Sequence, residues 1–343
     1  MLDNNEFTEA KEELLLLATM QSVEQLRRDY RIRYQESRAQ WGLHVGMQAQ
    51  GQQVLDGNLI EERGVVSKGL GDSKKFGGVL ERKHSGNKSA DLTHVYLTYE
   101  RNFFWGAREF EIDFKIGDDL RLKKEGTPLF LSLRPMLSNK GYMNATAWVT
   151  APEALSVAQW QTPRAYSSGV SFYSDVEKKW KSMVYDQRIG GEWRSLDYSG
   201  DRGKQSKADL VLLFHLPGPA WFSLISFGPG LSYARMTSQS TLLRSVYVND
   251  SLHYFVAGEL QTQLGNKSQD EIKAGARVGG DPRRDLAFAD SWSSWVEYIH
   301  PLGRGEGVRA HVEYSTEVPQ NYKGEQFSFM IMLDLLPNGG ADL

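Results

Sequence analysis

The chain of 343 residues contains no cysteine, which excludes disulfide bonds, thiolate catalysis and cysteine-ligated metals. Its seven histidines are scattered, and none has a neighbour at the spacing of a metal site. Phosphate-binding glycine loops, a dinucleotide motif, a nucleophile elbow and a paired-histidine zinc helix are also missing. We therefore expect no cofactor, no metal site and no enzymatic activity.

The chain also lacks a large excess of charge of either sign, and it lacks long hydrophobic runs. The net charge is -3, so the basic footprint of a nucleic-acid-binding protein is missing. No run approaches the roughly 18 apolar residues of a membrane-spanning helix. The longest helical-looking apolar run, 14–18, also lacks the basic flank and cleavage site of a signal peptide. If this is an envelope protein, we expect the chain to be part of a longer one.

What the chain does have is a period of two. In 106–117, Phe110, Ile112, Phe114 and Ile116 alternate with charged residues, which predicts a strand with one apolar and one charged face. The pattern recurs from residue 41 to residue 333 and predicts about 16 antiparallel strands joined mostly by short turns. A sheet of strands joined in a meander has two edge strands with unpaired backbone groups. With no helices to cover these edges, only closure of the sheet into a barrel removes them completely. We predict an all-β fold, a transmembrane up-and-down β-barrel.

A soluble all-β carbohydrate-binding or surface protein is the alternative. It would need large aliphatic inward faces, whereas here many apolar faces are thin, as at Ala274, Ala276 and Ala310, and the opposite faces carry charges in mid-strand. Lipid tolerates such thin outward faces, because nothing has to interlock with them. Nine Trp, fifteen Tyr and fifteen Phe are ample for the aromatic girdles of a membrane barrel. These observations favour the membrane.

Only the N-terminal part predicts a helix. Leu16, Met20, Val23 and Leu26 recur at spacings of three and four, with no Gly or Pro in the segment. We predict a helical segment at 1–39, which fits a helix packed on the sheet or the end of a helical repeat array. The barrel is expected at 40–335, with a tail at 336–343. Within the barrel, the strands we predict include 180–187, 193–198, 221–227, 231–235 and 242–248. We also predict long loops at 117–126 and 151–162, which are candidate gates.

The charged faces would line a wet lumen. The predicted path holds seven acids against four bases, Lys115, Lys273, Arg277 and Arg309, and so mildly favours cations. Three aromatic residues offer stacking faces to sugar rings. Glu109, Glu111 and Asp113 share one face of a strand, where a glycosidase acid and base pair is conceivable, but nothing nearby would desolvate one of them selectively. The predicted lumen residues are Glu100, Glu109, Glu111, Asp113, Glu259, Glu297, Glu313, Tyr96, Tyr142 and Trp148.

A helix-rich stretch ending near Arg38 passes directly into Trp41-Gly42-Leu43-His44-Val45 and some 16 predicted strands. This architecture resembles the C-terminal part of the exopolysaccharide export porins, in which a periplasmic tetratricopeptide superhelix precedes an outer-membrane barrel. The family includes the Pel, cellulose and poly-N-acetylglucosamine exporters, and the acidic stretch 109–113 makes the Pel-type porin the first choice.

The resemblance implies an outer-membrane location with the N-terminal helix in the periplasm. It further implies passage of a cationic, partly deacetylated amino-sugar polysaccharide. Its expected partners are the polymer, outer-membrane lipid, a periplasmic lipoprotein ring and a polymer-modifying enzyme, and nucleic acid is not among them. A general or substrate-specific outer-membrane porin is the alternative function.

Overall fold

The structure is a computed structural model that describes residues 43–54, 57–70, 74–85, 92–105, 108–119, 129–138, 141–154, 164–198, 201–219, 222–264, 270–303, 306–316, 318 and 324–335. The predicted helix within 1–39 and the predicted tail at 336–343 lie outside these residues. Among the described residues, no helix is both long enough and apolar enough to cross a membrane.

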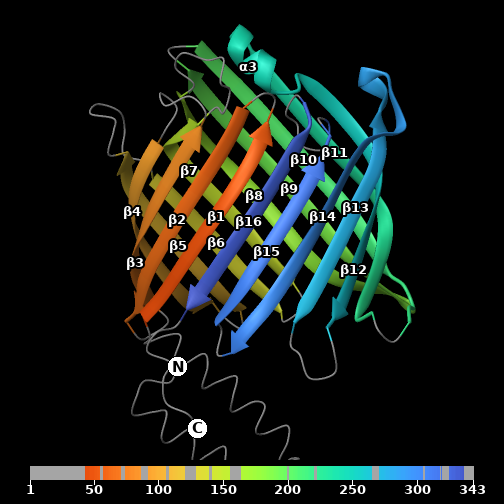
Figure 1. Cartoon of the computed structure of the whole chain (residues 1–343), viewed down its shortest axis with the longest axis horizontal. Coiled ribbons are helices and arrows are strands. Elements are labelled where there is room, and N and C mark those ends of the chain that lie inside the picture. The colour runs from red at the N-terminus through yellow and green to blue at the C-terminus, as the bar shows by residue number, and fades with distance from the viewer. Residues whose placement is uncertain are drawn as a thin grey trace, which may run out of the picture.

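Sixteen antiparallel strands close into a single barrel, in which each strand pairs with its neighbours in the chain (Figure 1). The first and last strands form the seam, with Val45 opposite Leu335. The predicted all-β, antiparallel barrel and its number of strands are therefore confirmed. The strands are β1 (Leu43–Val54), β2 (Gly57–Gly69), β3 (Lys74–Ser85), β4 (Leu92–Trp105), β5 (Arg108–Asp119), β6 (Leu129–Ser138), β7 (Gly141–Ala154), β8 (Arg164–Trp180), β9 (Met183–Tyr198), β10 (Asp201–His215), β11 (Leu224–Ser238), β12 (Asp250–Gln263), β13 (Glu271–Asp281), β14 (Leu286–Gly303), β15 (Glu306–Ser315) and β16 (Gln326–Leu335).

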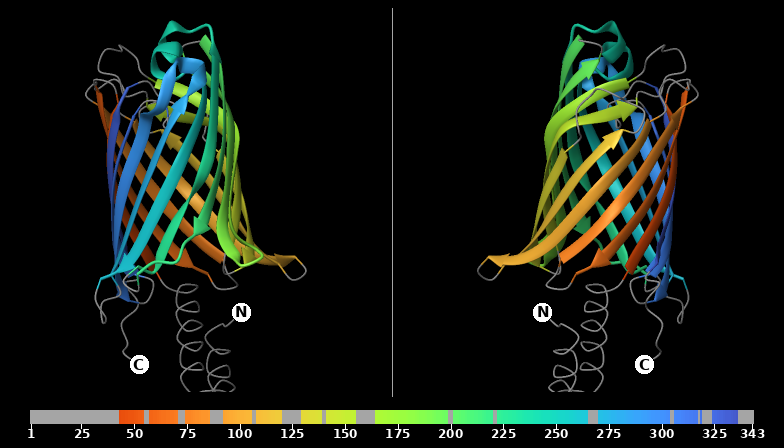
Figure 2. Two further views of the ribbon diagram at one scale, coloured as in Figure 1. Left: turned by 90° about the vertical axis from the view of Figure 1, so that its right-hand side faces the viewer. Right: turned by 90° about the vertical axis from the view of Figure 1, so that its left-hand side faces the viewer.

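The two ends of the barrel differ. At one end, below in Figure 2, β1 begins and β16 ends, and tight turns join most of the strands, as between Trp180 and Met183. At the other end most of the connections are longer, and they include α3 (Thr241–Val246) and the short helix η2 (Pro282–Arg284). We call these the short-turn end and the long-loop end. In outer-membrane barrels the short turns face the periplasm and the long loops face outward.

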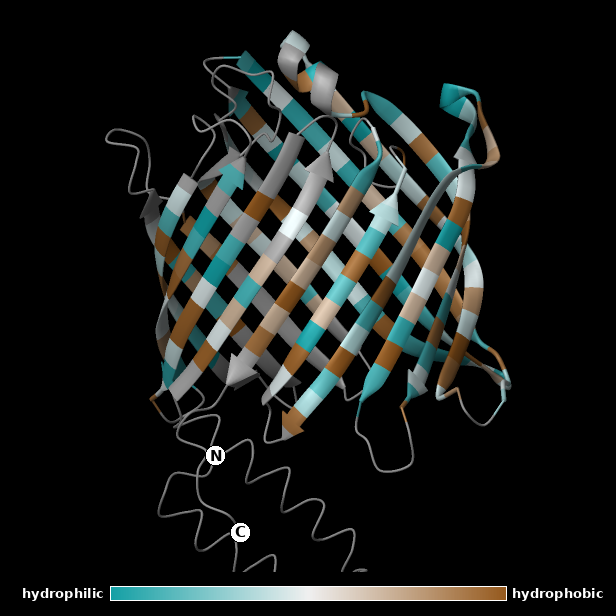
Figure 3. Ribbon diagram, in the orientation of Figure 1, coloured by the Kyte–Doolittle hydropathy of each residue, from teal (hydrophilic) through white to brown (hydrophobic). Residues whose placement is uncertain are grey.

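The barrel is apolar outside and polar inside. On β4, Val95 and Leu97 are 38% and 53% exposed, whereas His94, Tyr96 and Thr98, which alternate with them, are buried. The same alternation runs around the wall, and Figure 3 shows apolar and polar residues following one another along the strands. A soluble β-protein needs the reverse arrangement, because its apolar side chains must leave water. The apolar exterior matches the lipid-facing band of a transmembrane barrel.

Several boundaries predicted from the sequence were wrong. The predicted strand at 242–248 is α3, because Ser240 Oγ accepts the Leu243 backbone N–H as an N-cap and Leu243 is fully buried. Predicted strands at 221–227 and 231–235 are one strand, β11. Pro229 interrupts its pairing with β10 but stays opposite Val256 on β12. The predicted loops at 117–126 and 151–162 begin too early, since 117–119 and 151–154 are strand.

Candidate site on the inner wall of the barrel

The structure places the described members of the predicted lumen set on the inner wall. Tyr96 and Glu100 lie on β4, Asp113 on β5 and Trp148 on β7, at positions that alternate with exposed apolar residues. Glu259, Glu297 and Glu313 occupy inward positions of β12, β14 and β15. The remaining three, Glu109, Glu111 and Tyr142, have the inward register of β5 and β7, but their side chains lie outside what the structure describes. Contact of any of these residues with a substrate stays a prediction.

Most of the described carboxylates lie beside a base. Glu100 Oε2 is 3.4 Å from Lys75 Nζ, and Glu297 Oε1 is 3.3 Å from Arg309 Nε. Glu313 Oε2 lies 3.8 Å from the Nε2 atom of His311. The wall is therefore a mosaic of ion pairs rather than an acidic lining. Any preference for cations is weaker than the count from the sequence implies, because paired charges cancel at a distance.

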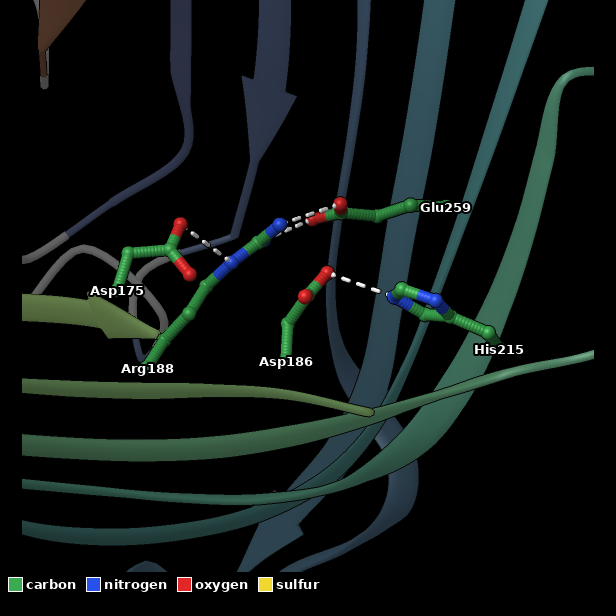
Figure 4. A network of polar contacts seen from close by, with 5 residues as sticks. All are labelled: Asp175, Asp186, Arg188, His215 and Glu259. Carbon is green, nitrogen blue, oxygen red and sulfur yellow. Dashed lines mark hydrogen bonds and ion pairs between the residues drawn. The ribbon is translucent and has the colours of Figure 1, made fainter. Parts of the chain in front are cut away.

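One ion-pair network reaches between strands that are not neighbours (Figure 4). Arg188 on β9 donates through Nη1 and Nη2 to both carboxylate oxygens of Glu259 on β12, with Nη2 2.8 Å from Oε2. Its Nε lies 3.2 Å from Asp175 Oδ2 on β8. Since β10 and β11 lie between β9 and β12, the pair crosses two strands. We call Arg188, Glu259 and Asp175 the Arg188 strut.

The inner positions of β11 beside Glu259 are small, which gives the strut its room. Ser226 is the direct partner of Glu259, and Gly228 follows it on the same face. A side chain at Gly228 would collide with the backbone oxygen of Leu212. Below the strut, Asp186 Oδ2 lies 3.1 Å from His215 Nε2. The strut therefore narrows the interior on this side of the barrel.

Sequence reasoning missed Arg188 as an inward residue because it ended a strand at Gln187 and started the next at Trp193. The intervening Gly190-Gly191 pair resembles a turn, whereas both glycines lie inside β9. The signal that reveals the strand is the continued alternation, since Asp186, Arg188, Glu192 and Arg194 recur at even positions. The missed inward residues include Arg63, Asp175, Asp186, Arg188, Glu192, Arg194, Lys207 and Asp209.

Four inward aromatic side chains each lie directly opposite a glycine on the next strand. The pairs are Tyr96 with Gly117, Trp148 with Gly169, Phe255 with Gly230 and Trp295 with Gly275. In each pair a Cβ on the glycine would run into the aromatic ring, at 2.7 Å from Trp148 and 2.5 Å from Trp295. The missing side chain lets the ring lie along the wall instead of standing in the lumen. We call these the glycine-backed rings.

Two of these rings are covered and two are partly open. Tyr96 is 4% exposed, with Lys115 Nζ 5.8 Å from its ring centre, and Phe255 is 3% exposed, with Arg277 Cζ 5.6 Å away. Trp148 and Trp295 are half-buried. Trp148 Nε1 donates to Ser167 Oγ at 3.2 Å, which fixes the orientation of its ring. Of the three predicted aromatic residues, the structure describes the side chains of Tyr96 and Trp148, and of these two only Trp148 offers an open face.

A cavity of about 590 Å³ connects the strut with the second open ring. It lies inside the wall formed by β8 to β10 and β12 to β14. Trp295 lines one side, and its ring stacks on His311 at 5.8 Å between centres. Charged groups of both signs line the rest, among them Arg188, Glu259, Lys207 and Asp209. The cavity therefore offers a flat aromatic surface for stacking and polar side chains for hydrogen bonds.

At the long-loop end, the connection that holds α3 packs against the wall. Leu243 and Tyr247 are fully buried, with Leu243 against Gly203 of β10. The guanidinium of Arg194 on β9 lies 5.3 Å from the centre of the Tyr247 ring, and its Nε donates to Gln205 Oε1 at 2.6 Å. Inward residues of β9 and β10 thus hold this connection at the mouth, where no gate was predicted.

Among the described residues there is no group of three or more His, Asp or Glu side chains that could hold a metal ion. Fold and inner wall together define the class: a closed 16-stranded β-barrel with an apolar exterior and a polar, aromatic interior, the architecture of outer-membrane porins.

Comparison with known proteins agrees with this class at the level of fold. No family model matches the chain, and no curated protein matches it in sequence. Among solved structures, a bacterial polysaccharide outer membrane secretin is similar with a TM-score of 0.62 and 11% identity, over 86% of this chain and 99% of that one. OprB of Pseudomonas putida matches with a TM-score of 0.41 and 9% identity, over 86% and 94%. A BenF-like porin from Pseudomonas fluorescens Pf-5 matches with a TM-score of 0.42 and 8% identity, over 86% of this chain and 97% of that one.

Proposed function

We propose that the protein is an outer-membrane porin that exports an exopolysaccharide, with a cationic amino-sugar polymer as the first candidate. The observation that carries this proposal is the set of glycine-backed rings. Trp148 and Trp295 present partly open flat faces along the inner wall while the glycines beneath them leave the path free. A polymer that slides through a pore needs repeated, weak and sequence-tolerant contacts. Stacking of sugar rings on aromatic faces supplies contacts of this kind.

The fold likeness to a polysaccharide secretin supports the same proposal. Ion pairs around the cavity add hydrogen-bonding groups for hydroxyl and amino substituents, among them the carboxylates of Glu259 and Asp209. In this proposal the short-turn end faces the periplasm, together with the helix predicted at 1–39. A lipoprotein ring and a polymer-modifying enzyme would engage the protein from that side.

A general or substrate-specific porin is the second candidate, and the Arg188 strut favours it. A constriction of paired charges selects small solutes by size and charge, whereas a polymer exporter has to keep its path continuous. Secretion separates the two functions: deletion of the gene should abolish the secreted polymer if the protein is an exporter, and should change only the uptake of small solutes if it is a general porin.

The direct test removes the open rings. Trp148→Ala and Trp295→Ala together should reduce secreted polymer several-fold while the protein still folds, as judged by detergent extraction and heat-modifiable migration on a gel. The matched control is Trp193→Ala, which removes an outward-facing tryptophan that is 46% exposed. Equal secretion by the double variant and the control would remove the stacking mechanism.

A separate experiment tests the charge of the polymer. Reversing Glu109, Glu111 and Asp113 to lysine should impair the export of a cationic polymer and leave a neutral one unaffected. Unchanged secretion would eliminate the electrostatic part of the proposal but not the stacking part.

A further inference from the structure

The outer surface of the barrel carries a cluster of bases at the long-loop end. Lys204 on β10 and Arg235 on β11 both point outward and are exposed. Lys204 pairs with Thr237 and Arg235 with Ser206, so the two bases are diagonal neighbours across the same pair of strands. Arg283 of η2 is the third member. We call Lys204, Arg235 and Arg283 the outer basic patch.

A tyrosine and one acid organise this patch. The Arg283 guanidinium lies 5.6 Å from the centre of the Tyr233 ring, two residues before Arg235 on the same face. Arg283 Nη1 also lies 2.6 Å from Asp250 Oδ1. Asp250 is the strand partner of Arg235, but its carboxylate is engaged by Arg283. Arg283 is therefore fixed in place, and the patch keeps a surplus of positive charge.

Lys204 and Arg235 have no ion pair with any acid in the described part of the chain. The next base along β10, Arg202, has its own partner in Asp197 at 3.7 Å. Exposed bases normally lie beside acids on a protein surface of small net charge. Two adjacent bases that form no ion pair with the described acids around them therefore indicate an anionic partner outside the chain.

The height of the patch indicates what that partner is. Below it the outward residues of the same strands are apolar, with Leu210 38% and Phe227 52% exposed. Trp193 and Tyr254, at 46% and 47% exposure, border this apolar surface. Such aromatic residues mark the boundary between acyl chains and headgroups, and bases just beyond the boundary lie at the level of the headgroups.

We propose that the outer basic patch binds the phosphate groups of a phosphorylated glycolipid in the outer leaflet. Arginine and lysine are the side chains that hold phosphate, by bidentate hydrogen bonds and by point charge respectively. The acyl chains of the lipid lie against Leu210 and Phe227, which favours a lipid over free phosphate. This inference rests on the outer-membrane location in the proposed function, and it is independent of which solute or polymer passes through the lumen.

The test compares lipids that differ only in phosphate. The full chain, folded in detergent micelles, is titrated with diphosphorylated lipid A and with its dephosphorylated form, and bound lipid is counted by native mass spectrometry. Near an anionic lipid surface each base contributes roughly fivefold in affinity. Lys204→Gln with Arg235→Gln should therefore weaken binding of the diphosphorylated form about thirtyfold. The control, Lys68→Gln with Lys178→Gln, removes two exposed, outward-facing bases at the short-turn end and should leave binding unchanged.

Equal binding of both lipids, or equal loss in the patch variant and the control, would overturn the proposal. Displacement of the lipid by millimolar inorganic phosphate alone would also overturn it, because it would show a site for the free anion. A protein that fails to enter micelles or to migrate as a heat-modifiable barrel would instead refute the outer-membrane location, so the two failures are distinguishable.

Discussion

Removal of Arg188 tests whether the strut narrows the pore. Arg188→Ala leaves the carboxylates of Glu259 and Asp175 without their base, with Asp186 nearby. We expect a higher single-channel conductance, because the bridge between β9 and β12 is gone. We also expect a higher cation selectivity, because two uncompensated carboxylates then face the lumen.

The loss of stability expected for Arg188→Ala follows from the distances and the exposure of the three side chains in the strut. Two unit charges about 4 Å apart attract by roughly 4 kcal/mol at an effective dielectric constant near 20. The side chains of Arg188, Glu259 and Asp175 keep 26%, 19% and 26% of their surface exposed. Water access and side-chain ordering therefore offset much of this attraction, and a net loss of about 1–2 kcal/mol is expected for the bidentate pair. Urea unfolding followed by heat-modifiable migration measures this loss.

A matched control separates the bridge from the charge. Arg309→Ala removes an inward arginine that pairs with Glu297 on the adjacent strand β14. The change in charge is the same, but no connection across intervening strands is lost. Planar bilayer recordings should therefore show an increase in selectivity for both variants and a large increase in conductance for Arg188→Ala alone. Identical conductance of the two variants would refute the narrowing.

Two further predictions concern packing. Gly275→Ala would place a methyl group 2.5 Å from the Trp295 ring. The free energy of unfolding should therefore fall by about 1–3 kcal/mol, and the tryptophan fluorescence should shift. The control is Gly64→Ala, which has no atom within 4 Å of the added methyl group and should change neither quantity. Leu243→Ala empties a fully buried position of α3 and should destabilise this connection by about 2–5 kcal/mol, seen as faster proteolysis within 239–249 and a noisier channel current. Unaltered proteolysis would contradict the packing of α3 against the wall.

The barrel could be predicted from the sequence because the alternation that specifies it lies within each single strand. Each strand must face lipid on one side and water on the other, so alternation such as that of 110–116 is repeated along the whole chain. The number of strands came out correctly although individual boundaries did not. In the sequence, Gly190-Gly191 and the segment around Pro229 look like the ends of strands. In the barrel both segments remain within a strand, because each is paired with at least one neighbouring strand.

The candidate site could be predicted only in part. Which face of a strand points inward follows from the alternation, and this identified Trp148 and Glu259. The strut could not be found in this way, because Arg188 and Glu259 meet only through the curvature that closure gives to β9–β12. The glycine-backed rings depend on register: Trp295 and Gly275 are 20 positions apart in the chain and become partners only when β13 and β14 are aligned.

Because β1 pairs with β16, the barrel closes only when the last strand is in place. A chain cut before Gln326 would leave β1 and β15 each with a row of unsatisfied backbone donors and acceptors, which no hydrocarbon environment tolerates. Partial versions of this molecule thus have no stable resting state in lipid, and its completion is all or nothing.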